Sequence, residues 1–394
     1  MPEEDIKVQL KEDILDILGI CINCRFCLPS CPRFDITSGE TSYGGSGLTR
    51  ALYYAVKWEM TDKETLTELR DLLYSCMTCK SCEVACKKLS TATKLVDAIE
   101  KGRQLLIEEM IGPMPDQKKV LESLYKYGNP YGLPPSKRKA WINEINIPGF
   151  SKEKEILLYT GCTTSYDLDV QPIVASLMQL LQKAKINFGT LEDEVCCGYP
   201  SIKLGEKGLF EEICERNLGQ FKSSGVKHII TISPHCFNTF SNIYPKEAME
   251  GVKVQHYTQY LDDLIKKKQL VFNKKIEKKV AYHDSCYLGR YNNIYIEPRR
   301  VLKSIPGLEV VEFRKNQDDS ICCGGGGGRM WSDFESETER IGNLRVKEAL
   351  SVGAETIVTA CPWCLINLRD GVKEVNVEAK LAVKDLAELC MEAL

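Results

Sequence analysis

Apolar residues recur at helical spacing through the first third of the chain, beginning at Leu10. One of the helical stretches is preceded by Thr61, and Glu64 follows three residues later, which is the pattern of a helix start with a threonine cap. The pattern therefore predicts a mostly helical N-terminal region. Its expected later helices cover residues 48–60, 63–73 and 93–110.

Proline and glycine gather between residues 128 and 152 and mark the clearest domain boundary in the chain. Beyond it, short β-rich runs alternate with helical stretches, which favours α/β units with a parallel sheet. This order occurs twice, and the repeat of about 125 residues is too long for a solenoid. We therefore expect two copies of one α/β domain with a pseudo-two-fold relation. The expected strands are residues 156–159, 186–188, 228–232, 280–282, 310–313 and 356–359.

Composition changes this picture little. The 394 residues suffice for two or three domains, and 43% hydrophobic with 27% charged residues is ordinary for a soluble globular protein. No apolar run reaches the roughly 18 residues of a membrane span, and the polar N-terminus has no apolar signal core. A cytoplasmic location is therefore expected. The net charge of −3 offers no basic field for nucleic acid.

Two basic stretches stand out locally, residues 137–139 and residues 266–279. We interpret both as solvated linkers, with a docking patch for an acidic partner as the alternative.

Seventeen of the 19 cysteines fall into four spaced groups, which in a reducing compartment indicates metal or redox chemistry. Two groups are complete C-x2-C-x2-C-x3-C runs, typical of ferredoxins. In two-cluster ferredoxins the fourth cysteine of each run ligates the other cluster. The expected [4Fe–4S] ligand sets are therefore Cys21, Cys24, Cys27 and Cys86 for one cluster, and Cys76, Cys79, Cys82 and Cys31 for the other.

The 44 residues between the two runs read as helices, so the predicted domain is a helical ferredoxin. The alternative is a pair of four-thiolate zinc sites, which would normally use separate C-x2-C pairs. The first run ends in Pro32, as the ferredoxin pattern does, whereas Lys87 follows the second run.

The other two groups share a second pattern, a single cysteine, then a vicinal pair, then C-x2-C. The C-terminal copy is complete, with Cys286, Cys322, Cys323, Cys361 and Cys364. Five thiolates with a vicinal pair exceed what one cubane needs and indicate a larger or distorted cluster. In the earlier copy Ser233 stands where the fourth cysteine would be, which leaves Cys162, Cys196, Cys197 and Cys236.

These motifs resemble the cysteine-rich CCG domain. The resemblance rests on Cys196-Cys197-Gly198, Cys322-Cys323-Gly324, the segment His283 to Arg290, and Cys361-Pro362-Trp363-Cys364. CCG domains occur in catalytic subunits of heterodisulfide reductases, in iron–sulfur subunits of glycolate and lactate oxidases, and in proteins that link electron-transferring flavoprotein to quinone. A helical ferredoxin followed by two CCG domains is similar to the fused, D-type subunits of heterodisulfide reductases.

The resemblance implies a multidomain fold with pseudo-symmetric α/β CCG domains. Its expected parts are a helical ferredoxin domain at 1–127, a linker at 128–152, a first CCG domain at 153–272 and a second at 273–394. It also implies a noncubane [4Fe–4S] cluster at the complete motif, whose five cysteines are the catalytic candidates. Ser233 leaves three alternatives for the first motif: an altered iron–sulfur cluster, a zinc ion, or a purely structural role.

Five consecutive glycines follow the second vicinal pair, without the lysine of a phosphate loop. We interpret Gly324, Gly325 and Gly326 as a cradle around the cluster, because glycine lets backbone amides approach closely. Contact with a flavin on a partner is the alternative.

The function implied is that of an iron–sulfur oxidoreductase subunit that needs a partner for activity. It would carry electrons between a flavin subunit, such as a 2-hydroxy-acid oxidase or an electron-transferring flavoprotein, and a quinone-type or membrane acceptor. In that role the protein could lie peripherally at the inner face of the membrane. The alternative is a catalytic heterodisulfide reductase subunit that splits a disulfide at the noncubane cluster.

Several side chains keep two interpretations. Arg290 and Arg329 are candidates for positioning an anionic substrate or partner, or for structural ion pairs. His235 and His283 are expected to be ordered residues at strand ends rather than ligands. The remaining cysteines, Cys214 and Cys390, are expected to be buried thiols in helices.

Overall fold

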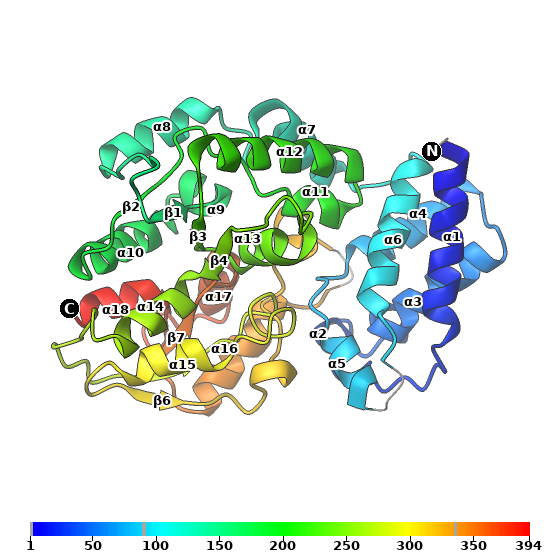
Figure 1. The fold of residues 1–394 in the computed structure, drawn as a ribbon. Coiled ribbons are helices and arrows are strands. Elements are labelled where there is room, and N and C mark those ends of the chain that lie inside the picture. Colours follow the sequence, from blue (N-terminus) through cyan, green and yellow to red (C-terminus); the bar gives the residue numbers. More distant parts are fainter. Residues whose placement is uncertain (1–2, 89–91, 335–336) are drawn as a thin grey trace.

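The computed structural model describes residues 3–88, 92–334 and 337–394. Its N-terminal part is helical and lies at one end of the molecule, and two α/β units make up the rest (Figure 1). The helices at that end are α1 (Glu3–Gly19), α2 (Pro32–Ile36), α3 (Gly45–Lys57), α4 (Lys63–Tyr74), α5 (Ser81–Lys88) and α6 (Leu95–Glu108), with a short 3-10 turn at Thr41–Tyr43. The next helix, α7 (Pro115–Tyr127), lies over the first α/β unit instead (Figure 1).

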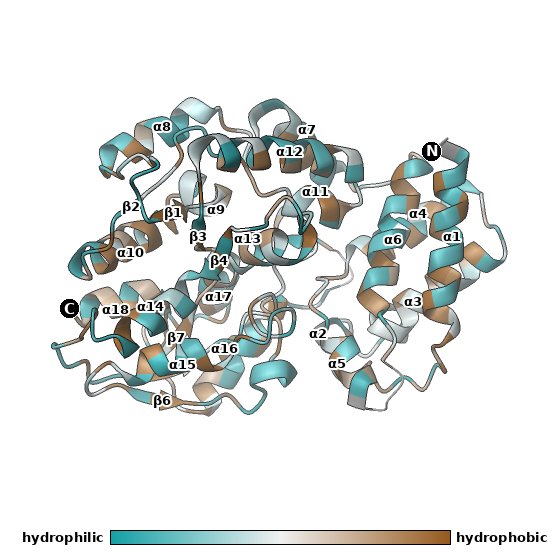
Figure 2. Ribbon diagram, in the orientation of Figure 1, coloured by the Kyte–Doolittle hydropathy of each residue, from teal (hydrophilic) through white to brown (hydrophobic). Residues whose placement is uncertain are grey.

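The longer N-terminal helices are amphipathic, with hydrophilic and hydrophobic residues alternating along α1, α3 and α6 (Figure 2). Helix α1 packs against α3 and α6 through buried residues that include Ile14 and Leu52. The predicted cap of α4 is wrong by one residue. Asp62, not Thr61, is the N-cap, because its carboxylate accepts a hydrogen bond from the Thr65 amide at 2.8 Å.

The first α/β unit contains a four-stranded, fully parallel sheet in the order β2-β1-β3-β4. Its central strand β1 is buried along its whole length. The strands are β1 (Ile156–Tyr159), β2 (Phe188–Gly189), β3 (His228–Thr231) and β4 (Lys253–His256). The helices are α9 (Cys162–Tyr166), α10 (Gln171–Lys183), α11 (Tyr199–Leu204), α12 (Lys207–Ser224), α13 (Pro234–Asn238) and α14 (Tyr257–Lys266), with a π-helical turn at Thr239–Ile243.

The second unit repeats this arrangement with a parallel sheet in the order β6-β5-β7-β8. Its strands are β5 (Lys279–Tyr282), β6 (Glu309–Val311), β7 (Thr356–Thr359) and β8 (Ala382–Asp385), and its helices are α15 (Ile296–Lys303), α16 (Ile341–Ser351), α17 (Pro362–Glu374) and α18 (Leu386–Glu392), with 3-10 turns at Gln317–Asp319 and Arg329–Trp331. The predicted mixture of a helical region and two parallel α/β sheets is confirmed. The edge strands β4 and β8 were not predicted.

The two α/β units pack against each other through corresponding helices. Helix α10 of the first unit contacts α18 of the second, and α15 of the second contacts α14 of the first. A hydrogen bond of 2.7 Å from the Tyr257 hydroxyl to the Asp385 carboxylate joins the starts of α14 and α18. Cys214 and Cys390 are buried in α12 and α18.

The segment 128–152, predicted as a linker, contains the helix α8 (Pro135–Glu144), which packs against α9. None of the helices in the described part of the chain is long and apolar enough to cross a membrane.

Candidate metal centres

The four cysteines expected for the first ferredoxin cluster line one small cavity, although Cys86 lies 59 positions after Cys27. The cavity lies beside the start of α3, where Ser46 contributes to its wall, and beside Leu95 of α6. The Thr93 amide donates a hydrogen bond to the Cys86 sulfur at 3.4 Å. The members of this set, called the first ferredoxin site below, are Cys21, Cys24, Cys27 and Cys86.

The second expected set lines a neighbouring cavity. Gly45 separates the two sites, since a Cβ built there would lie 2.8 Å from the Cys82 Cβ and 3.6 Å from the Cys27 sulfur. Burial and the neighbouring Cys79 raise the pKa of Cys31 to about 12, so a thiolate here needs a bound cation. The members of this second ferredoxin site are Cys31, Cys76, Cys79 and Cys82.

The two ferredoxin loops share a backbone feature. The residue on each side of the middle cysteine has a positive φ, namely 52° and 60° at Asn23 and Arg25, and 52° and 61° at Thr78 and Lys80. Left-handed conformations are costly for non-glycine residues and persist where the surroundings fix them. The turns curl each loop so that its three cysteines face one cavity. None of these positions is glycine, so the usual sequence signal of a left-handed residue is missing from both loops.

The first CCG motif forms a third group. Cys162, Cys196, Cys197 and Cys236 line one small cavity, in which the Cys162 and Cys196 sulfurs lie 3.8 Å apart. Ser233 lines the same cavity as the N-cap of α13. Its hydroxyl accepts a hydrogen bond from the His235 amide and lies 3.3 Å from the His235 Nδ1 atom.

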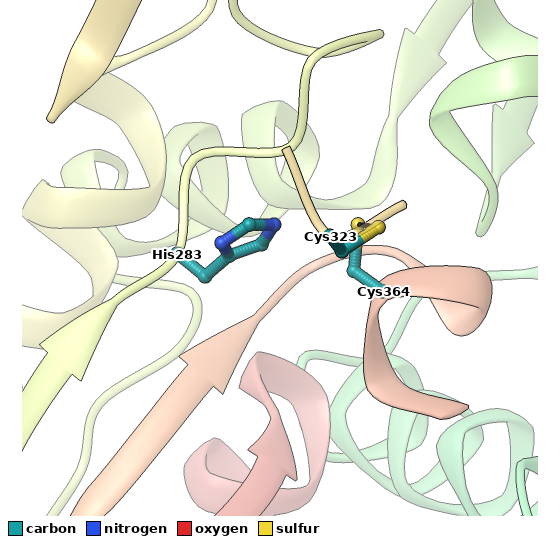
Figure 3. A group of neighbouring side chains, drawn as sticks. All are labelled: His283, Cys323 and Cys364. Atoms are coloured by element: carbon teal, nitrogen blue, oxygen red, sulfur yellow. Dashed lines mark hydrogen bonds between the residues drawn. The ribbon is translucent and has the colours of Figure 1, made fainter. Parts of the chain in front are cut away.

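The second CCG motif forms the fourth group. The Cys323 and Cys364 sulfurs lie 3.2 Å apart, Cys322 contacts Cys286, and Cys361 contacts Cys364. His283, which follows β5, directs its ring at this group, and its nearest ring nitrogen lies within 4.8 Å of both Cys323 and Cys364 (Figure 3).

The His283 ring is held from its other side. The Arg345 Nε atom lies 3.2 Å from the His283 Nδ1, which makes Nδ1 the acceptor and places the ring proton on Nε2. Nε2 is buried and has no hydrogen-bond partner in the described part of the chain. His283 is therefore more than an ordered strand-end residue, because its unpaired donor faces the cysteines.

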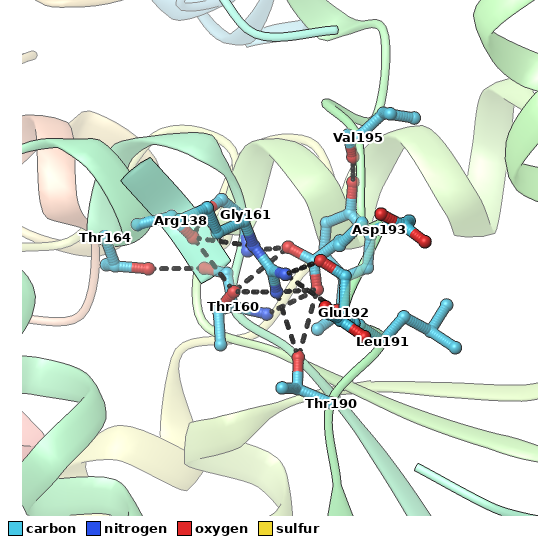
Figure 4. Close-up of polar contacts among 12 residues, drawn as sticks. Arg138, Thr160, Gly161, Thr164, Thr190, Leu191, Glu192, Asp193 and Val195 are labelled. Carbon is cyan, nitrogen blue, oxygen red and sulfur yellow. Dashed lines mark hydrogen bonds and ion pairs between the residues drawn. The ribbon is translucent and has the colours of Figure 1, made fainter. Parts of the chain in front are cut away.

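The first CCG motif is anchored by a buried ion pair that was not predicted from the sequence. Arg138 pairs with Glu194 at 3.3 Å and donates to the Leu191 and Glu192 carbonyls, so its interpretation as part of a solvated linker is wrong (Figure 4). Glu194 in turn accepts hydrogen bonds from the Thr160 and Gly161 amides, directly before Cys162. Burial of both charges is tolerated because each is fully hydrogen-bonded.

The glycine run contacts both the second CCG motif and the ferredoxin region. The Gly324 amide donates to the Cys322 sulfur at 3.4 Å. A Cβ on Gly326 would lie 2.4 Å from the Met77 carbonyl oxygen, and one on Gly327 would lie 2.3 Å from the Cys76 carbonyl oxygen. Glycine is thus required where the run packs against the second ferredoxin loop. This role of Gly326 and Gly327 was not foreseen.

The second ferredoxin site and the second CCG group meet directly. Cys79 and Cys322 lie close enough that Cys322 raises the pKa of Cys79 and Cys79 lowers that of Cys322. Arg103 links the second ferredoxin loop to the glycine run, because it donates hydrogen bonds to the Cys76 carbonyl at 2.7 Å and to the Gly327 carbonyl at 2.8 Å.

Buried aromatic rings fill the space between the two CCG groups. The ring of His235 lies 4.4 Å from that of Trp363 and 4.5 Å from those of Tyr199 and Tyr287. The Trp363 indole donates to the Thr163 hydroxyl at 2.8 Å, across the boundary between the units. His235, from the first CCG motif, also lies beside Cys361 of the second, and it lowers the pKa of the Cys361 thiol together with Cys364 against the effect of burial.

A larger, polar cavity of about 290 Å³ opens beside Cys323 and Gly324. Arg329 lies in its wall and pairs with Glu337 at 2.6 Å, so the structural ion pair expected as one alternative for Arg329 is present. The Arg329 Nε and the Ser332 hydroxyl are buried without hydrogen-bond partners in the described ranges.

Three of the cysteine sets, the two ferredoxin sites and the second CCG group, fit iron–sulfur clusters. Backbone amides donate to the sulfurs of Cys76, Cys86 and Cys322 at 3.3 to 3.4 Å, which favours negatively charged sulfur. The buried His283 Nε2 and Arg290 Nη2 atoms have no hydrogen-bond partner in the described ranges, so they are free to donate hydrogen bonds to a group bound beside the cysteines. An iron–sulfur cluster held at these thiolates would supply one-electron storage.

Comparison with known proteins supports this chemistry. A cysteine-rich CCG domain model matches residues 156–241 and 280–369, and a 4Fe-4S dicluster domain model matches residues 20–89.

The chain is also similar to curated proteins. It is 36% identical over 333 residues to the probable iron-sulfur-binding oxidoreductase FadF of Bacillus subtilis, covering 82% of this chain and 46% of that protein. It is 32% identical over 427 residues to the EtfAB:quinone oxidoreductase of Syntrophomonas wolfei, covering 97% and 59%. The chain thus spans only about half the length of these two relatives.

A third relative matches over nearly its whole length. The D-type subunit of the dihydromethanophenazine:CoB--CoM heterodisulfide reductase of Methanosarcina barkeri is 30% identical over 408 residues, covering 98% of this chain and 95% of that protein. The chain therefore belongs to the family of D-type heterodisulfide reductase subunits and related iron–sulfur oxidoreductases that carry CCG domains.

Proposed function

We propose that this chain is an iron–sulfur electron-transfer subunit that carries electrons between a flavin partner and a quinone-type or membrane acceptor. The two ferredoxin sites would hold [4Fe–4S] cubanes. The second CCG group would hold a noncubane [4Fe–4S] cluster and form the end of the path, where electrons enter or leave. The first CCG group, with Ser233, would hold an altered cluster or zinc, or serve structure alone.

The observation that carries the proposal is that the cysteine sites lie next to one another in a series. The first and second ferredoxin sites are separated by Gly45, and the second ferredoxin site touches the second CCG group through Cys79 and Cys322. Each site would therefore lie next to its successor, as one-electron transfer through a protein requires. The residues between neighbouring cysteine sites are packed and buried, so the distances between the sites are fixed.

The choice of partners rests on the relatives. One is named an EtfAB:quinone oxidoreductase, and another a probable iron-sulfur-binding oxidoreductase. An electron-transferring flavoprotein is therefore the favoured flavin partner, and a quinone the favoured acceptor. Because the chain spans about half the length of these relatives, a further protein or segment would complete the path to the acceptor.

A second candidate function is reduction of a heterodisulfide. The match over 95% of a D-type heterodisulfide reductase subunit and the cavity of about 290 Å³ beside Cys323 favour it. If two clusters were to split one disulfide, the substrate would have to lie between the two CCG groups. That space holds the packed rings of His235, Tyr199, Tyr287 and Trp363 instead. For this reason we favour the electron carrier.

Counting iron, zinc and labile sulfide on anaerobically purified protein separates the alternatives. About 12 irons per chain correspond to three four-iron clusters, and about 16 would show that the Ser233 site also builds one. Absence of labile sulfide would refute the proposal. Dye-linked reduction of a low-molecular-weight disulfide, lost in Cys323→Ala, would favour the reductase.

We also infer that the two α/β units are related by a pseudo-two-fold axis. The identical strand orders support this, as do the reciprocal contacts of α10 with α18 and of α15 with α14. Superposition of the units in an experimental structure would test it, and a rotation far from a half-turn would contradict it.

A further inference from the structure

Arg290 lies at the junction of the second ferredoxin site and the second CCG group. Its Nε atom donates to the Cys79 carbonyl at 2.6 Å, and its Nη1 atom donates to the carbonyls of Ser320 at 2.6 Å and Asp318 at 3.1 Å. All three acceptors are neutral. The guanidinium is thus fixed in position by backbone groups from both parts of the molecule.

The charge of Arg290 is compensated differently from that of its neighbours. Arg299 pairs with Asp284, and Arg345 pairs with Glu348. Among the ion pairs of residues 3–88, 92–334 and 337–394, none includes Arg290. Its Nη2 atom is buried and has no hydrogen-bond partner in those ranges. A buried, permanently charged donor without an acceptor is costly unless another group takes up its charge.

Three thiols and the Tyr295 hydroxyl act on this charge. Burial opposes the guanidinium charge, but Cys79, Cys286 and Cys322 together raise the pKa of Arg290 above its ordinary value. One of these thiols belongs to the second ferredoxin site and two belong to the second CCG group. Arg290 therefore faces both sites at the point where Cys79 and Cys322 touch.

We propose that Arg290 is a shared positive charge for the second ferredoxin site and the second CCG site. The inference rests on the proposed iron–sulfur sites. An electron that moves from one site to the other removes one negative charge from the first and adds it to the second. A fixed cation beside both stabilises the reduced form of each, and so raises both reduction potentials.

The chain offers a matched control at the first ferredoxin site. Arg50 likewise donates to a ligand carbonyl, from Nη2 to the Cys21 oxygen at 3.4 Å, and its Nε is buried without a partner in the described ranges. Substituting Arg50 removes an equivalent guanidinium from the other end of the cysteine series. The two arginines should therefore act on different sites.

The test is a potentiometric titration followed by electron paramagnetic resonance on the anaerobic, cluster-loaded chain. In Arg290→Gln, the potentials of the second ferredoxin and second CCG sites should both become more negative, and that of the first ferredoxin site should stay unchanged. Arg50→Gln should give the converse pattern. Arg290→Lys, which keeps the charge but loses the planar fork, should fall between wild type and Arg290→Gln.

Unchanged potentials in Arg290→Gln at full iron content, or an equal shift of all three sites, would overturn the inference. If Arg290→Gln loses iron, Arg290→Lys decides the matter. In Arg290→Lys, the reduction potentials of the second ferredoxin and second CCG sites alone should then become more negative. Wild-type potentials at both sites would overturn the inference. Protein without labile sulfide would instead refute the iron–sulfur function itself, so the two failures are distinguishable.

Discussion

Replacing Gly327 by alanine should separate the ferredoxin region from the second CCG unit. Gly327 has a φ of +64°, and a Cβ there would lie 2.3 Å from the Cys76 carbonyl oxygen. Restoring even a 3.0 Å separation moves the backbone by at least 0.7 Å. The movement also strains the hydrogen bonds from Arg103 to the Gly327 and Cys76 carbonyls.

The expected cost has two parts. A left-handed alanine costs about 1 kcal/mol, and overpacking at a rigid contact adds about 2 kcal/mol. Gly132 supplies the control, because it has a φ of +70° but nothing within 4 Å of a built Cβ. Gly132→Ala should therefore cost only about 1 kcal/mol.

Thermal midpoints of the cluster-loaded variants, recorded anaerobically at one scan rate, measure this difference. Gly327→Ala should melt several degrees below Gly132→Ala, because its additional cost is about 2 kcal/mol. It should also weaken the magnetic interaction between the second ferredoxin and second CCG clusters, whereas Gly132→Ala should leave that interaction intact. Equal midpoints with an unchanged interaction would refute the reasoning about the contact.

Other single side chains are open to equally direct tests. Burial raises the pKa of Asp385 from 3.8 to about 8. As the pH rises, the unfolded chain therefore releases this proton before the folded chain does. The free energy of unfolding should fall by about 1.4 kcal/mol per pH unit between pH 5 and 8. Asp385→Asn should remove that slope in thermal midpoints, and an unaltered slope would contradict the assignment. Cys31→Ser should lose about four irons per chain by elemental analysis, whereas the remote Cys214→Ser should lose none; equal iron contents would exclude Cys31 as a ligand. His235→Phe keeps an aromatic ring beside Trp363 but removes the imidazole that acts on Cys361, so the paramagnetic signal of the second CCG site should shift at constant iron content; an identical signal would argue against this interaction.

Much of the fold follows from local patterns. The alternation of apolar runs predicted most of the parallel strands, because a buried strand is marked by its own residues. The strands β4 (Lys253–His256) and β8 (Ala382–Asp385) escaped prediction, since polar residues interrupt the apolar run in each of them. Arg138 was misassigned for a related reason. Its neighbours on the chain are an exposed lysine and a half-buried one, and its partner Glu194 is distant in sequence.

The cysteine chemistry of this protein can be read from the chain alone, because thiolate spacing within a short loop is local and independent of the remaining fold. Which sites adjoin one another is a property of the packed molecule. Four such relations join segments up to 251 positions apart in the chain. They are the proximity of Cys79 and Cys322, the approach of Gly327 to the Cys76 carbonyl, the proximity of His235 and Cys361, and the position of Arg290 beside Cys79. Such contacts depend on how whole elements pack, and packing is set by the complementary shapes of many side chains, which no single motif encodes.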